Sequence, residues 1–500
     1  MHIGQVLDAV YDSDVGWRPS SGGIKPVHVA NGMVRALQRK SYDTTQLNEF
    51  AVWWQPGKIP DERRALDALK RADTRGALRA ISGSPQEFDR LRRYVLGLVG
   101  ADKALFPAAD KSSFSLTCGQ MASRDDNDRG LGDFASILLA GSGDGPSLAA
   151  EVLRGLTSDK PGDPVTSLVW PLLSDKAHEY KPKARSAAAL KAHNRKALAP
   201  ILAAADTLAT HESSQGNRLQ TLHRAVHFAC VATHVHAQAL TGNGDPGARP
   251  PALMVIGGAR RSELAAASER SIDIVYGAFE EWLCERLMVR LQKEGQLAEG
   301  IVLPNVERLD GRSMRALLSR VGSAKKPHDT PSKDELDGRL ALYREIHQDM
   351  PDATNSALIA RTLVSCYVDE FDSGGPRRFL QALGRKAGLL YPHFQGNARD
   401  KRVRPSVAIL DMLVRGCVPA GGLVPLQDFL ATLWERFGLI VGGRREEEWD
   451  DVEALGNWGL AVEPKALEKN TDAFVDELVM MGLARRYPDD VAFVGDGHGA

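Results

Sequence analysis

The sequence has few cysteines and no long hydrophobic run, and each absence excludes a class of protein. Its five cysteines are scattered, and no two of them form a Cys-x-x-Cys pair. This spacing argues against a disulfide framework and a zinc ribbon, and it favours a reducing compartment. No stretch of about 18 apolar residues is uninterrupted, so we expect no membrane span. The first residues, Met-His-Ile-Gly-Gln, lack a charged segment leading into an apolar one, so we expect no secretory signal and a cytoplasmic protein.

The chain also lacks an excess of charge and the common catalytic motifs. Its formal net charge is −1, so any nucleic-acid surface must come from local segregation of charge. It contains no GxSxG nucleophile turn, no GxxxxGK[ST] phosphate loop and no HExxH zinc motif. We therefore assign no catalytic residue, no metal ligand and no cofactor. A metal-dependent nuclease built from dispersed carboxylates and a lysine would carry no such motif, and it stays open as an alternative.

What is present indicates a globular protein that is mainly α, with several domains and minor β structure. The hydrophobic content of 43% and the charged content of 25% are those of ordinary soluble proteins. The polar, proline-containing stretch 322–334 marks the best domain boundary. The longest helical pattern, 262–292, predicts a spine helix, with an oligomer seam as the alternative. The predicted regions are a mixed, mostly helical region 1–140, a central helical body 141–321, a helical region with a basic arm 335–404, and a winged-helix-like domain 405–500.

The C-terminal region predicts two helices, an acidic loop, a third helix and a two-stranded ribbon. Pro464 suits the first position of the last helix, and Gly482 fits its left-handed closing position. Two short apolar runs around a Pro-Asp-Asp turn at 488–490 then predict a hairpin. Upstream, residues 407–414 and 426–437 show the apolar repeats of two more helices. Three helices followed by a ribbon are typical of a winged helix, a variant of the helix-turn-helix.

A strongly basic segment precedes this region. Between Pro376 and Arg404 there are eight lysines or arginines and one acidic residue, with Tyr391, His393 and Phe394 interleaved. Cations follow a phosphate backbone, and aromatic rings can stack on exposed bases. We therefore interpret the segment as a nucleic-acid-binding arm, with a solvated basic surface as the alternative. The candidate nucleic-acid-binding residues, which include two arginines of the predicted ribbon, are Arg377, Arg378, Arg385, Lys386, Arg399, Lys401, Arg402, Arg404, Arg485 and Arg486.

The last predicted helix is acidic rather than basic. Between Pro464 and Met481 two lysines stand against four acidic residues, whereas a helix that reads the major groove should present donors and positive charge. We therefore expect the basic arm and the ribbon arginines to contact nucleic acid, DNA rather than RNA. The acidic helix would then dock a partner protein. A purely protein–protein scaffold is the alternative.

One helical pattern resembles a metal site. His223, His227, Cys230 and His234 follow at spacings of four, three and four, which keeps them on one helix face. His223 and His227 could chelate zinc as a pair one turn apart. The four residues extend roughly 16 Å along the axis, at about 1.5 Å per residue, which is too far for one ion. We interpret the stripe as packing against a neighbouring helix and leave metal binding by the first two histidines open.

The stretch Gly384-Arg385-Lys386-Ala387-Gly388-Leu389-Leu390-Tyr391-Pro392, with the winged-helix pattern behind it, resembles accessory subunits of bacterial antiphage and DNA-modification-linked defence operons. These are large, mostly helical subunits that work beside helicases, ATPases or nucleases. The resemblance covers about the last quarter of the chain. It implies a cytoplasmic, non-enzymatic subunit of a multi-protein complex, and it carries over no catalytic residue. The acidic last helix departs from the usual DNA-reading pattern.

Overall fold

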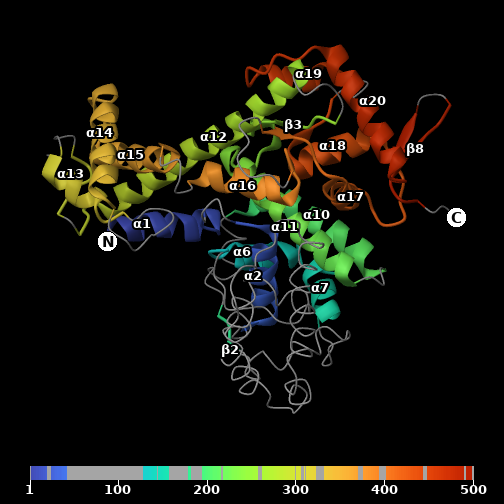
Figure 1. Cartoon of the computed structure of the whole chain (residues 1–500), viewed down its shortest axis with the longest axis horizontal. Coiled ribbons are helices and arrows are strands. Elements are labelled where there is room, and N and C mark those ends of the chain that lie inside the picture. Colours follow the sequence, from blue (N-terminus) through green and yellow to red (C-terminus); the bar gives the residue numbers. More distant parts are fainter. Residues whose placement is uncertain are drawn as a thin grey trace, which may run out of the picture.

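The structure is a computed structural model, and it is mainly helical, as the sequence predicts (Figure 1). The residues that it describes are 2–19, 24–41, 128–143, 145–156, 178–181, 194–214, 218–256, 262–298, 300–305, 309, 311–321, 331–369, 375–393, 401–442, 448–488 and 491–497. Among these residues, no helix combines the length and the apolar character needed to cross a bilayer.

The elements keep the labels of Figure 1. The helices are α1 (Ile3–Val10), α2 (Pro26–Gln38), α6 (Leu131–Leu139), α7 (Leu148–Leu156), α10 (Arg195–Ser213), α11 (Arg218–Thr241), α12 (Glu263–Glu294), α13 (Gly311–Leu318), α14 (Lys333–Asp349), α15 (Asn355–Asp369), α16 (Pro376–Ala387), α17 (Val407–Cys417), α18 (Leu426–Phe437), α19 (Glu448–Gly456) and α20 (Pro464–Met480). The strands are β1 (Lys40–Ser41), β2 (His178–Glu179), β3 (Ala252–Leu253), β4 (Leu390–Tyr391), β5 (Arg402–Val403), β6 (Val424–Pro425), β7 (Leu439–Ile440), β8 (Ala484–Arg486) and β9 (Ala492–Val494).

Helix α11 lies at the centre of the molecule. It packs against α2, α6, α7, α10, α12, α16 and α17. Every residue from 225 to 240 is buried, as expected of a helix that is surrounded on all sides. Polar side chains on α11 are therefore taken out of water and must find partners inside the protein.

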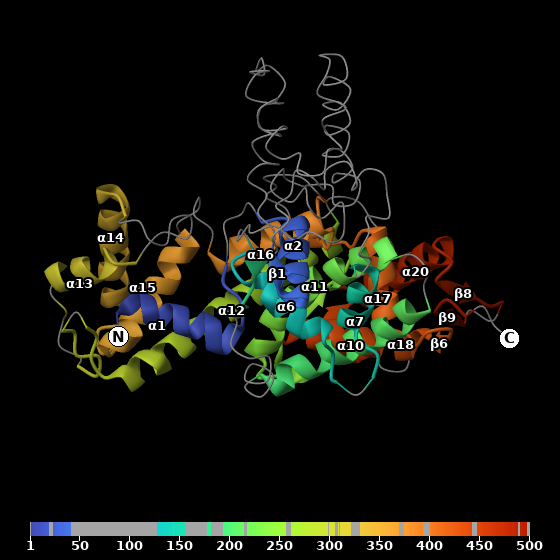
Figure 2. The ribbon, with the colours of Figure 1, turned by 90° about the horizontal axis from the view of Figure 1, so that it is seen from below.

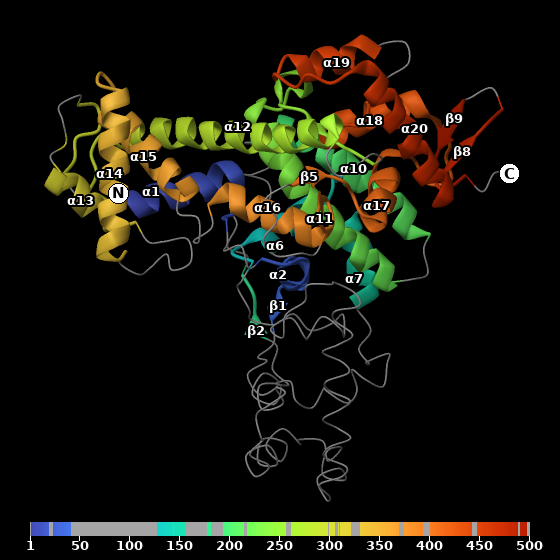
Figure 3. The same ribbon diagram turned by 45° about the horizontal axis from the view of Figure 1, so that its top comes forward.

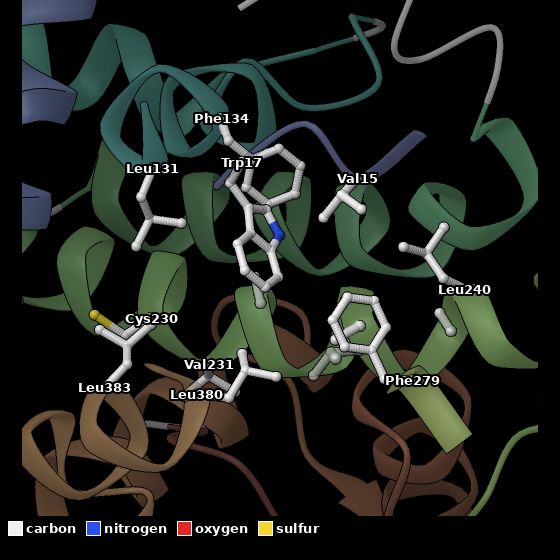
Figure 4. Packing of buried hydrophobic residues seen from close by; sticks show 14 of the residues in the cluster. Val15, Trp17, Leu131, Phe134, Cys230, Val231, Leu240, Phe279, Leu380 and Leu383 are labelled. Atoms are coloured by element: carbon white, nitrogen blue, oxygen red, sulfur yellow. The ribbon is translucent and has the colours of Figure 1, made fainter. Parts of the chain in front are cut away.

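The core is continuous across the molecule. The indole ring of Trp17 lies 6.0 Å from the ring of Phe279 and 5.1 Å from that of Phe379, measured between centroids. Figure 4 shows Trp17 among side chains from α6, α11, α12 and α16. One cluster of buried residues extends from Ile3 to Val494 and draws on all four predicted regions. The division into four domains stays a prediction.

Helices α2 and α6 cross at two glycines. A Cβ on Gly132 would lie 2.2 Å from the backbone carbonyl carbon of Gly32, and a Cβ on Gly32 would lie 2.1 Å from Oδ2 of Asp128. Only glycine therefore lets the two backbones approach this closely. The close approach brings the Arg35 guanidinium to 3.1 Å from the Asp128 carboxylate, which also accepts a 2.8 Å hydrogen bond from the amide of Gly132.

Helix α12 is the spine helix that the sequence predicts. The Ser262 side chain caps it by accepting a 3.1 Å hydrogen bond from the amide of Ala265. Its apolar stripe, including Phe279 and Leu287, is buried. It packs against α1 and α15 and also against α11, α16, β3 and β5. Figures 2 and 3 show α13, α14 and α15 gathered at one end of the molecule and β8 and β9 at the other.

The C-terminal region contains the predicted helices and ribbon, with additions. Helix α20 has Pro464 in its first turn, and Gly482 follows it with a φ of +72°. The predicted hairpin is β8 paired with β9, and β6 joins it in an antiparallel sheet of order β6-β9-β8. The end of the segment expected to be an acidic loop forms α19, so that part of the prediction was wrong.

Strand β7 joins the C-terminal region to the central body, because it pairs in parallel with β3. The buried side chain of Asn470, on α20, completes the junction. Its Oδ1 accepts a 3.0 Å hydrogen bond from the amide of Ile256. Its Nδ2 donates to the carbonyl oxygens of Met254 at 2.8 Å and Val441 at 2.7 Å. One buried amide thus satisfies three backbone groups at the ends of two strands.

Candidate nucleic-acid interface

Helix α16 positions four of the ten predicted basic residues. Pro376 occupies its first turn, and Gly388, with a φ of +88°, closes it. Its buried side chains, Phe379 and Leu383 among them, pack against α11 and α12. Residues 376–387, predicted as part of an arm, are therefore a helix packed on the core. The apolar residues between the cations recur every three or four positions and form one helix face.

Three cations from α16 and one from the residue before β5 come together, and we call them the cationic cluster: Arg377, Arg378, Arg385 and Lys401. The ammonium of Lys401 donates a 2.6 Å hydrogen bond to Oε1 of Gln381. Burial lowers the pKa of Lys401, and the charges of Arg385, Arg378 and Arg377 lower it further. The pKa of Arg385 is lowered by burial and then by Arg378. Each cation lowers the pKa of its neighbours because like charges that lie close together disfavour the charged form.

Two carboxylates of α12 balance the cluster in part. Arg377 donates from Nε to Oε1 of Glu280 at 3.0 Å and from Nη2 to Oε2 at 2.7 Å, a two-pronged pair. The Glu280 side chain is 9% exposed, and burial raises its pKa. Asp273 is exposed and raises the pKa of Lys401. Asp273 and Glu280 thus place two negative groups beside the four positive groups of the cluster.

Two further predicted cations lie on the ladder of β4 and β5, where Tyr391 pairs with Arg402. The guanidinium carbons of Arg402 and Arg404 lie 4.9 and 5.5 Å from the ring centre of Tyr391, as in cation–π contacts. His393 packs edge-on against the same ring, and its Nε2 donates to the carbonyl oxygen of Arg404 at 2.5 Å. Arg402 is only 4% exposed. These two arginines are therefore held against a tyrosine rather than extended into solvent.

The remaining residues of the predicted arm do not join the cluster. Lys386 donates a 2.9 Å hydrogen bond to the carbonyl oxygen of Ile24 and so fastens α16 to the segment before α2. Arg399 and Phe394 lie outside the described residues.

The two ribbon arginines lie far from α16, at the β8–β9 end of the molecule (Figure 1). Arg486 pairs with the carboxylates of Asp472 and Asp476 on α20, each at 3.4 Å. Arg485 donates a 2.6 Å hydrogen bond to the carbonyl oxygen of Gly497. The acidic face of α20 thus offsets the positive charge of the hairpin. This arrangement favours the cationic cluster over the ribbon as a phosphate-contacting surface.

The histidine stripe of α11 is packed inside the protein. His227, Cys230 and His234 are buried, and burial lowers the pKa of both histidines to about 3. Nδ1 of His234 lies 3.3 Å from the hydroxyl oxygen of Tyr276, and the His223 ring lies 4.2 Å from that of His227. In the part of the chain that the structure describes, no three His, Cys, Asp or Glu side chains are grouped to hold a metal ion.

Nothing in the sequence points to Glu280, Gln381 or Asp273 as members of this surface. Glu280 and Arg377 are 97 residues apart in the chain, and they meet only because α16 packs on α12. A pair of adjacent acids on a long helix is ordinary in any sequence. The contact therefore depends on the packing of two helices, which local patterns do not specify.

No protein-family model matches the chain, and no curated protein matches it in sequence. The function is therefore argued from the cationic cluster itself.

Proposed function

We propose that the protein is a non-enzymatic cytoplasmic subunit of a bacterial defence or DNA-transaction complex, and that its cationic cluster contacts nucleic acid, DNA rather than RNA. The observation that carries the proposal is that Arg377, Arg378, Arg385 and Lys401 gather so closely that the three arginines lower the pKa of Lys401. Like charges held together destabilise a protein, and a bound anion removes that cost. Arginine and lysine are the side chains that bind phosphate oxygens.

The cellular context of the proposal comes from the resemblance of residues 384–392 and the region behind them to accessory subunits of antiphage defence operons. Such a subunit would contact DNA while a partner carries the chemistry. A metal-dependent nuclease is the enzymatic alternative. Cleavage of DNA that requires a divalent cation and survives extensive purification would favour that alternative.

The C-terminal region supports a second proposal, that it is a winged helix that docks a partner protein. Helices α17, α18 and α20 are followed by the β8–β9 hairpin, the order of a winged helix with α19 inserted. Among the described residues, four of the seven exposed large hydrophobic side chains lie between 479 and 491, at the end of α20 and on the hairpin: Val479, Met480, Tyr487 and Val491. Gathered exposed apolar groups are typical of protein-binding surfaces. Replacing Met480, which is 76% exposed, with glutamate should abolish co-purification of a partner without lowering the melting temperature.

The first proposal is tested by fluorescence anisotropy with a labelled DNA duplex. The Arg378→Gln/Lys401→Gln variant removes two members of the cluster. The matched control, Lys293→Gln/Arg312→Gln, removes two exposed cations from the end of α12 and from α13. At about 50 mM salt we expect the control to bind like the wild type and the cluster variant to bind at least about tenfold more weakly. Melting curves check that all three proteins are folded. Equal affinities for the three proteins, or no binding by the wild type, would contradict the proposal.

A further inference from the structure

The outward face of α20 ends in an exposed stripe of acidic and apolar side chains. The inward face of the helix, which includes Phe474, is buried. On the outward face, the side chains of Asp472 and Asp476 are 62% and 63% exposed, and those of Val479 and Met480 are also exposed. Residues three or four apart on a helix are neighbours, so these four side chains form one continuous surface, which we call the α20 stripe. Figure 3 shows α20 and β8 at the end of the molecule opposite α13.

The α20 stripe is the negative half of this helix face. Two lysines, Lys465 and Lys469, lie on the same face one to two turns before Asp472. The last turn of α20 includes Glu477, at a position where helices favour basic side chains because their carbonyl ends carry partial negative charge. Asp476 and Glu477 therefore add to the negative end of the helix dipole. A cation that approaches this end of α20 is attracted by the carboxylates and by the carbonyl groups together.

Arg486 of the hairpin is a cation that already approaches the stripe. Its guanidinium lies 3.4 Å from a carboxylate oxygen of Asp472 and of Asp476, and all three side chains are exposed. Exposed ion pairs of this kind are weak, because water solvates both partners. A cation of a binding partner can therefore replace Arg486. Apolar contacts beside it would exclude water and strengthen the new ion pair.

We infer that the α20 stripe binds a basic amphipathic helix of a partner protein, with lysines or arginines on Asp472 and Asp476 and apolar side chains on Val479 and Met480. The inference rests on the proposed docking function of the C-terminal region and names the chemistry of the partner. A helix suits the stripe, because its side chains repeat with the same pitch of about 5.4 Å. From residue 472 to residue 480 the stripe is about 12 Å long, which corresponds to about two turns of the bound helix.

The test uses the full-length protein and two labelled synthetic peptides of about 18 residues, which share one leucine face of an amphipathic helix. One peptide carries lysines on its other face, and the second carries glutamates there. We expect the lysine peptide to bind at least about tenfold more tightly than the glutamate peptide, as read by fluorescence anisotropy. Met480→Ser should weaken binding of the lysine peptide about tenfold, because it removes an apolar contact from the interface.

A double variant tests the charges of the stripe. Asp472→Asn/Asp476→Asn should weaken binding of the lysine peptide about fivefold, because two ion pairs with the peptide are lost. The matched control, Glu345→Gln/Asp349→Asn, removes two exposed acidic residues at the same spacing from α14, at the other end of the molecule. The control should bind like the wild type. Melting curves check that all variants are folded.

The outcomes separate the inference from the proposed docking function. Failure to bind the lysine peptide, equal binding of the two peptides, or equal affinities of the stripe and control variants would overturn the inference. If Met480→Ser weakened both peptides equally, apolar docking would still stand. A wild-type dimer in light scattering that Met480→Ser converts to a monomer would identify a second copy of the chain as the occupant and would also overturn the inference. If Met480→Ser left peptide binding unchanged and Met480→Glu left co-purification of a partner unchanged, the proposed docking function would be wrong as well.

Discussion

Replacing Glu280 with glutamine should strengthen DNA binding. In the structure the Glu280 carboxylate holds the Arg377 guanidinium in a two-pronged pair. Glutamine keeps the size of the side chain and can accept one hydrogen bond, but it carries no charge. The net positive charge of the cationic cluster would rise by one, and Arg377 would become able to contact a phosphate.

The magnitude of the gain follows from counterion release. Each additional phosphate contact adds about 0.9 to the slope of log affinity against log salt. Over a fourfold change in salt, from about 50 to about 200 mM, one contact contributes a factor of about 3.5. The affinity of Glu280→Gln should therefore fall about 3.5 times more than that of the wild type over this range.

The matched control is Glu281→Gln, which removes the same charge from the adjacent residue. Glu281 is 59% exposed and pairs with Arg361 of α15 rather than with an arginine of the cluster. Salt titrations of both variants and the wild type, read by anisotropy, give the three slopes. If the two variants share one slope, or if Glu280→Gln binds more weakly than the wild type, then Arg377 is not held back by Glu280 and the reasoning is refuted.

Three further predictions concern stability and are read by urea or thermal unfolding. Gly132→Ala should destabilise the protein by about 3 kcal/mol or more, because its Cβ would lie 2.2 Å from a backbone atom of Gly32. A decrease in the free energy of unfolding of less than about 1 kcal/mol would show that α2 and α6 can move apart freely. Asn470→Ala should cost about 3 kcal/mol, since it removes three hydrogen bonds worth about 1 kcal/mol each; an unchanged midpoint would contradict the junction. Buried His234 and His236 have pKa values lowered to about 3 and about 4, below the ordinary value of about 6.5. The unfolded chain therefore binds protons at these histidines at a higher pH than the folded protein does. The free energy of unfolding is unaffected above about pH 6.5 and decreases below it, by about 2.7 kcal/mol for each histidine at about pH 4.5. A melting temperature that stays constant down to about pH 4.5 would contradict this.

Helices with complete local signals were predictable. Helix α12 has a serine cap and a buried stripe, and α20 has a proline in its first turn with a glycine behind it. These signals act within one or two turns, so the sequence predicts such helices without knowledge of the rest of the fold. The β8–β9 hairpin was predictable for the same reason, because its turn residues lie between two short apolar runs.

Features that depend on packing were not predictable. The sequence predicts the basic segment to be an arm. In the structure, residues 376–387 form a helix whose apolar side chains pack against α11 and α12. The charge of Arg377 is offset by Glu280, and that of Arg486 by Asp472 and Asp476. Counting cations along the chain therefore overstates the positive surface. The excess charge can be located only after the carboxylates of other helices are in place.

The central claim is that Arg378 and Lys401 of the cationic cluster contact DNA phosphates, and the salt dependence of binding tests it most directly. Two contacts predict a slope of about −1.8, so the wild type should bind about 12-fold more weakly at about 200 mM salt than at about 50 mM. The Arg378→Gln/Lys401→Gln variant, which lacks both contacts, should show almost no change in affinity over the same range. Wild-type binding that does not respond to salt, or an equal slope in the two proteins, would contradict the account.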